Sequence, residues 1–173
     1  MDEPIDEPQD EPQEDPTPEQ EPVGFDLSRV VLIVVGAHLR AEEADRTLAY
    51  QLMSAVETWV EEHQEYLEED LRAMVCTDAL YLNDESLHHR ATISVGGPGV
   101  NALSAYFAQQ MEGDSDLRPD QVIIQMDPDF ADLRVAIWGV NHETTDQGVG
   151  LFIRDYLDGF LRAVATQVEP RDG

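Results

Sequence analysis

The sequence predicts an α/β fold with three layers, built on a mixed, mostly parallel sheet of about five strands. Three observations lead to this fold class. The continuous β-branched run Val30–Val35 is typical of a strand buried on both faces. Apolar residues at helical spacing follow that run, so the two segments form a strand–helix unit. A later strand enters a turn with three glycines and then a second helical pattern, as in many open α/β sheets.

The other elements can be assigned in chain order. After the first strand, the predicted elements are a helix over 41–60, a strand over 73–77, a polar loop over 83–86, a strand over 91–95, a helix over 102–111, a loop over 113–120, and strands over 122–126 and 133–138. The short gap between the last two strands cannot hold a parallel crossover, which needs a dozen residues or more. We therefore expect these two strands to form an antiparallel hairpin.

The last helix is predicted from an apolar stripe that continues without a break to Val164. Thr144 and Gln147 have the spacing of a capping box at its start. Together these elements predict a single Rossmann-like domain over residues 25–168. Residues 1–24 form an acidic, proline-rich tail that we expect to be disordered, and residues 169–173 a flexible C-terminus.

Charge limits the classes of partner. The chain has 37 acidic residues against 10 basic ones, for a net charge of −27. Such a charge repels phosphate backbones and anionic lipids, so we expect no nucleic acid and no membrane as partner. Lysine is absent, which fits either an arginine-preferring genome or a salt-rich habitat. With no secretory pattern and no long apolar run, a cytoplasmic location is expected.

The sequence has no recognised catalytic or metal-binding motif. The single cysteine, Cys76, lies in an apolar run and is expected to act as a small hydrophobic residue. Phosphate binding at the glycine turn is disfavoured by Pro98, which removes one backbone donor, and by the lack of a following lysine. We therefore predict no metal site and favour a protein that is not an enzyme, and the sequence leaves the cofactor unknown.

Candidate ligand-binding residues lie where the predicted strands end. In open α/β sheets, ligands bind beyond the carboxyl ends of the parallel strands. The candidates at these ends are Gly96, Gly97, Gly99, Asn101, Asp78, His38, Asn141 and His142. If the last strand is parallel to the first three, these residues should line one crevice.

Each candidate also has a structural explanation. Asn101 is a good helix N-cap, and Asp78 could cap a short helix after the second strand. The glycines could serve only to turn a strand tightly into a helix. His38 and His142 could be ordinary loop residues.

The motif Val95-Gly96-Gly97-Pro98-Gly99-Val100-Asn101 resembles the Val-Gly-Gly-Pro-x-x-Asn turn in a domain of archaeal surface-layer proteins. In that family a hairpin, an apolar strand, a glycine-containing turn and a C-terminal helix follow. The segment 135–140 and the pair Thr145-Asp146 match those places, so the similarity covers roughly residues 91–164. This resemblance implies a structural or interaction role.

Two functions are therefore expected from the sequence. The first is a non-enzymatic protein-interaction or structural module, which could also form a homo-oligomer. The alternative is a domain that binds a small molecule, such as a nucleotide or phosphate, at the turn Gly96 to Asn101. An open crevice would favour the second function, and a large exposed apolar patch would favour the first.

Overall fold

The computed structural model describes residues 29–67, 71–109 and 121–167, and it confirms the predicted fold class. Its five-stranded sheet has the order β2-β1-β3-β5-β4. The strands are β1 (Val30–Val35), β2 (Arg72–Thr77), β3 (Thr92–Val95), β4 (Val122–Gln125) and β5 (Arg134–Gly139). All are parallel except β4, which pairs antiparallel with β5 as a hairpin at the edge. The sheet is therefore mixed and mostly parallel, as expected.

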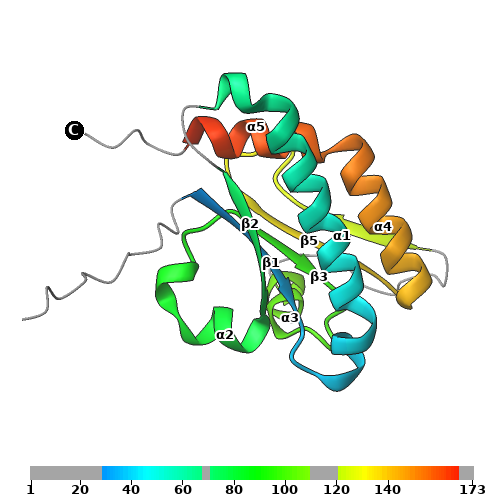
Figure 1. The fold of residues 1–173 in the computed structure, drawn as a ribbon. Helices are drawn as coiled ribbons and strands as arrows, with labels where there is room; N and C mark the ends of the chain where they lie inside the picture. The colour runs from blue at the N-terminus through cyan, green and yellow to red at the C-terminus, as the bar shows by residue number, and fades with distance from the viewer. Residues whose placement is uncertain (1–28, 68–70, 110–120, 168–173) are drawn as a thin grey trace, which may run out of the picture.

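Helices cover both faces of this sheet (Figure 1). The helices are α1 (Leu39–His63), α2 (Asp78–Asn83), α3 (Ala102–Gln109), α4 (His142–Asp155) and α5 (Leu157–Gln167). Two short 3-10 turns, η2 (Gln64–Tyr66) and η3 (Glu85–Leu87), follow α1 and α2. Helices α1, α4 and α5 pack on one face, and α2 and α3 pack on the other. This arrangement gives the three layers.

The larger core lies between the sheet and the layer formed by α1, α4 and α5. Side chains such as Leu52, Phe152 and Phe160 are fully buried there against the inward residues of β1, β3 and β5. At the far end of α1, Trp59 Nε1 donates a hydrogen bond of 2.9 Å to Asp158 of α5. Because the indole is otherwise buried, this bond satisfies its N–H while it joins the two helices.

The smaller core lies under α2 and α3. Tyr81, Leu103 and Phe107 pack there against alternate residues of β1 and against Trp138 of β5. Every residue of β1 is buried, because neighbouring side chains of this central strand enter opposite cores. The β-branched run in the sequence thus reports burial on both faces, as predicted.

The C-terminal helix differs from the prediction in two respects. It is two helices, because the backbone leaves helical geometry at Tyr156, where φ is −126° and ψ is −24°. Its N-cap is Asn141, three residues before the predicted capping threonine. The Asn141 side chain accepts a hydrogen bond from the backbone N–H of Thr144, and the Thr144 hydroxyl accepts one from the backbone N–H of Asn141. Thr144 is thus the second member of the capping box.

The predicted tail over residues 1–24, the loop over 113–120 and the C-terminus over 169–173 lie outside the described residues. Within the described part of the chain, no helix combines the length and apolar character needed to cross a bilayer.

Candidate functional site

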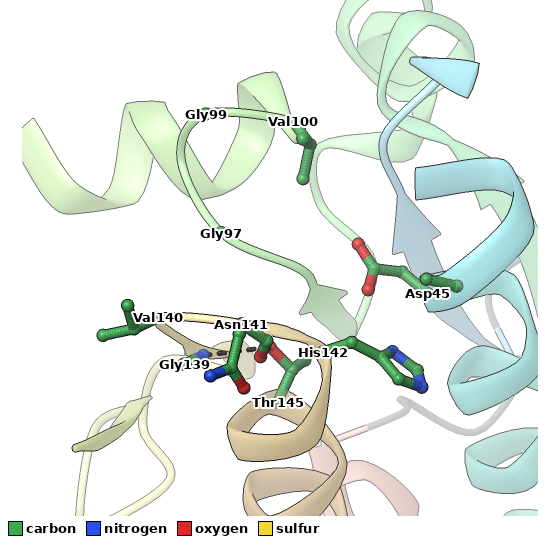
Figure 2. A pocket seen from close by; sticks show the side chains of 10 residues that line it. Asp45, Gly97, Gly99, Val100, Gly139, Val140, Asn141, His142 and Thr145 are labelled. Atoms are coloured by element: carbon green, nitrogen blue, oxygen red, sulfur yellow. Dashed lines mark hydrogen bonds between the residues drawn. The ribbon is translucent and has the colours of Figure 1, made fainter. Parts of the chain in front are cut away.

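A cavity of about 380 Å³ opens between α1, the glycine turn after β3 (residues 96–101) and the start of α4 (Figure 2). Its walls are formed by Ala44, Asp45, Gly97, Gly99, Val100, Gly139, Val140, Asn141, His142 and Thr145. The volume is at the lower end of the range for small-molecule sites.

The sheet topology explains the position of the cavity. From β1 the chain crosses to β2 on one side, and it then returns across β1 to β3 on the other. The loops that follow neighbouring strands therefore diverge at the carboxyl ends of β1 and β3, where open α/β sheets leave room for a ligand. Because β3 and β5 are parallel neighbours, the glycine turn and the start of α4 lie at the same edge and form the walls.

Among the described residues, Asp45 is the one acidic residue in the cavity wall. It lies in the second turn of α1 and is only 6% exposed. Figure 2 shows its carboxyl group pointing from α1 toward the glycine turn. Burial raises the pKa of this carboxyl group, and the charge of His142 acts in the opposite direction. In the part of the chain that the structure describes, no hydrogen-bond donor to Asp45 contributes to this pKa shift.

The first turn of α4 forms the opposite wall. Asn141 and His142 are exposed and line the cavity. The Thr145 hydroxyl accepts a bond of 3.0 Å from the backbone N–H of Gly139 and donates one of 2.9 Å to the carbonyl of Asn141. These bonds hold the turn between β5 and α4, so the wall is preorganised. The positive end of the helix dipole faces this side of the cavity.

Two of the three candidate glycines, Gly97 and Gly99, line the cavity. Gly96 has a different role, because its φ of +101° is a conformation that favours glycine. A Cβ at Gly96 would also overlap the Oδ2 atom of Asp45. The absence of a side chain at this position therefore allows the buried carboxyl group to lie against the turn.

Asp78 and Asn101 are buried and do not line the cavity. Asp78 accepts hydrogen bonds from three backbone N–H groups, those of Ala37 at 2.8 Å, Ala79 at 2.7 Å and Ala102 at 2.7 Å. It thereby joins the ends of β1 and β2 to the start of α3. The geometry supports the structural explanation for this residue.

Asn101 is 1% exposed and uses both ends of its amide. Its oxygen accepts from the backbone N–H groups of Leu103 and Ser104, as a helix cap does. Its nitrogen donates to the carbonyls of Val34 and Val95 and to the Ser94 hydroxyl. No further group of Asn101 is left to hold a ligand.

His38 is exposed in the turn before α1 and is not part of the cavity wall. The structure thus places four of the eight candidates, Gly97, Gly99, Asn141 and His142, around one cavity. Sequence reasoning missed Asp45 and Thr145. Asp45 had a visible signal, because it interrupts the apolar stripe of α1 formed by Ala41, Leu48 and Leu52.

The described residues contain no group of three or more His, Cys, Asp or Glu side chains able to hold a metal ion. Cys76 is buried among apolar side chains, and burial raises the pKa of its thiol to about 11. Because the thiolate is the reactive form, this cysteine is a poor nucleophile. Comparison with models of protein families and with curated proteins finds no match to this chain.

Proposed function

We propose that this protein is a binding domain for a small organic molecule, held in the cavity between α1, the glycine turn and α4. The observation that carries the proposal is the Asp45 carboxyl group, which belongs to a side chain only 6% exposed, points toward the glycine turn at this cavity and has no hydrogen-bond donor among the described residues. Buried polar groups in proteins almost always have hydrogen-bond partners. A bound ligand would supply the missing partner here.

A substitution that fills the cavity tests this proposal. A Cβ at Gly97 would point across the cavity toward the carbonyl of Gly139, at 3.8 Å, and Gly97 does not have a positive φ. Gly97→Leu should therefore occlude the site without backbone strain. Gly150→Leu is the matched control, because Gly150 is exposed on α4 and has open space around its Cβ position.

The measurement is a thermal-unfolding screen against amines, amino acids, nucleotides, sugar phosphates and polyols. A ligand present at about a hundred times its dissociation constant adds about 2.7 kcal/mol to the stability of the folded state. We expect at least one class to raise the unfolding temperature of the native chain and of the Gly150→Leu variant, but not that of Gly97→Leu. A chain that responds to no class would refute the proposal, as would a response that Gly97→Leu leaves intact.

We also propose a second function, the protein-interaction or structural role implied by the surface-layer resemblance. Three large apolar side chains, Leu80 and Leu82 of α2 and Tyr106 of α3, are 41–50% exposed on the layer opposite the cavity. Light scattering over a concentration series tests self-association. If the mass stays that of a monomer and the ligand screen is positive, self-association is refuted and only the binding function remains supported.

A further inference from the structure

The chemical class of the ligand can be inferred from the surroundings of Asp45, on the basis of the proposed binding function. Asp45 follows Ala41 by one helical turn and precedes Ala49 by another, and both alanines are buried. A carboxyl group in such a stripe loses its hydration when the helix packs on the sheet. It needs either a proton or a partner with positive charge.

Among the described residues, the positive charge near this position comes from the N-terminal end of α4 and from His142. The glycine turn, which lies against the carboxyl group, has no titratable side chain. From α4 the only charged neighbour that affects Asp45 is His142, which is exposed to solvent. Three donors of the β5–α4 turn, the backbone N–H groups of Gly139 and Thr144 and the hydroxyl of Thr145, are already used within that turn. The Asp45 carboxylate is therefore available to a ligand.

Charge on the whole molecule favours the same sign of ligand. With a net charge of −27, the chain has a negative surface potential that attracts cations and repels anions. A metal ion is a poor fit, because the described residues gather no set of three ligating side chains. A phosphate is also a poor fit, because it would have to approach a buried carboxylate.

We propose that the cavity binds a small organic cation, a protonated amine, whose ammonium group donates hydrogen bonds to the carboxylate of Asp45. Charge-assisted N–H donors to a carboxylate are among the strongest hydrogen bonds in proteins. The cavity of about 380 Å³ leaves room for the organic part of the molecule between the glycine turn and α4. The exposed side chains of Asn141 and His142 lie where they would contact that part.

Matched pairs of probes test the requirement for positive charge in the native chain. The pairs are putrescine against 1,4-butanediol, and phenethylamine against 2-phenylethanol. Affinities are measured by calorimetric titration of the full chain at neutral pH. We expect one or both amines to bind at least tenfold more tightly than the alcohol of the same shape.

Two variants test the role of Asp45. Asp45→Asn keeps the size of the side chain but removes its charge, so amine affinity should fall at least tenfold while the unfolding temperature of the free protein rises. Glu43→Gln removes one charge from the exposed face of the same helix and should change neither quantity appreciably. A purely structural Asp45 would instead lower the unfolding temperature when substituted.

The outcomes separate the ligand class from the proposed function. If the alcohols bind as tightly as the amines, or if Asp45→Asn keeps its amine affinity, the proposal of a cationic ligand is refuted, but the cavity remains a binding site. If no amine binds, while another class in the screen binds to the native chain but not to Gly97→Leu, the proposed ligand class is refuted and the proposed binding function is supported. If no compound binds in either experiment, the proposed function fails as well. The comparison of amine with alcohol needs no variant, so a poorly folded Asp45→Asn would not leave the question open.

Discussion

At the scale of single residues, the glycine turn contains positions with different requirements. Gly96 combines a φ of +101° with a carboxyl group at the place of its missing side chain. Gly99 has neither constraint, since its Cβ position has no atom within 4 Å. The two residues belong to the same turn, so they form a matched pair.

We predict that Gly96→Ala lowers the free energy of unfolding by about 1–3 kcal/mol, because an alanine at positive φ is strained. Gly99→Ala should leave the stability within about 0.5 kcal/mol of the native value. Urea unfolding of both variants measures the difference. Equal stabilities would show that the turn does not impose the conformation at Gly96.

The three backbone donors on Asp78 lead to a second prediction. Asp78→Ala should destabilise the chain by at least about 2 kcal/mol, because it leaves buried N–H groups without acceptors. Asp78→Asn retains one acceptor oxygen and should lose less. Chemical unfolding of the two variants ranks them. Equal free energies of unfolding for the alanine and asparagine variants would show that the Asp78 carboxylate does not connect β1, β2 and α3.

Burial of Asp45 makes stability depend on pH. Because the folded-state pKa of Asp45 lies above its ordinary value of 3.8, folding favours the protonated form. Its contribution to stability is therefore complete below pH 3.8 and is lost as the pH rises through the raised pKa. Asp45→Asn cannot titrate, so its advantage over the native chain should be absent at low pH and grow as pH rises. Unfolding curves of both proteins, measured from below pH 3.8 upward, test the direction of this change. A stability advantage of Asp45→Asn that shrinks with rising pH would contradict it.

Asp45 also shows what sequence reasoning can find at this scale. Its place in the apolar stripe of α1 is visible in the sequence, but the same position fits a partly exposed acid at the edge of a helix. Conversely, Asp78 and Asn101 were good candidates because they follow strands. Only the directions of their side chains, toward backbone donors at the start of α3, show that these residues are used within the fold.

At the scale of elements, α4 approaches the sheet closely through Gly148. A Cβ there would lie 2.7 Å from Val122 Cγ1 and 3.0 Å from Ile137 Cγ2, so both β4 and β5 contact the helix at this point. Gly150, two residues later, faces solvent. The same substitution at the two positions should therefore have opposite effects.

Gly148→Ala should destabilise the chain by about 1–3 kcal/mol through overpacking. Gly150→Ala should stabilise it by about 0.5–1 kcal/mol, because alanine has the higher helix propensity. Thermal unfolding monitored by circular dichroism measures both changes. Two changes of the same sign would contradict this packing of α4.

The order and type of elements could be predicted because periodicity and loop length carry that information. The antiparallel hairpin followed from the short segment between β4 and β5. The break at Tyr156 could not be predicted, because the apolar stripe continues through it from Phe152 to Phe160. In the structure α5 meets α1 through the Trp59–Asp158 bond, and such long-range contacts leave no periodic signal.

At the scale of the whole molecule, charge should make stability depend on salt. A net charge of −27 destabilises the compact state through repulsion among carboxylates. From roughly 0.01 M to roughly 1 M NaCl the Debye length falls from about 30 Å to about 3 Å, which screens this repulsion.

We therefore expect the unfolding temperature to rise steadily over this range of NaCl. Potassium chloride at the same ionic strength is the control, and it should act like NaCl if screening is the cause. An unfolding temperature that does not change with salt would contradict the expectation. A rise limited to the sodium salt would indicate bound ions instead.

The position of β1 in the sheet has a consequence for how the chain is made on the ribosome. This most apolar strand is synthesised before both of its neighbours, since Val30 pairs with Arg72 and Leu32 with Thr92. On one face β1 packs mainly against α1, which follows it directly in the chain, but the helices of its other face, α2 and α3, come only after β2 and β3. The nascent chain therefore carries an incompletely covered, aggregation-prone strand until β2, β3 and α3 have been synthesised. The acidic residues that precede it in the sequence are charged residues of the kind that flank aggregation-prone strands, and we expect them to reduce association of the nascent chain with other chains.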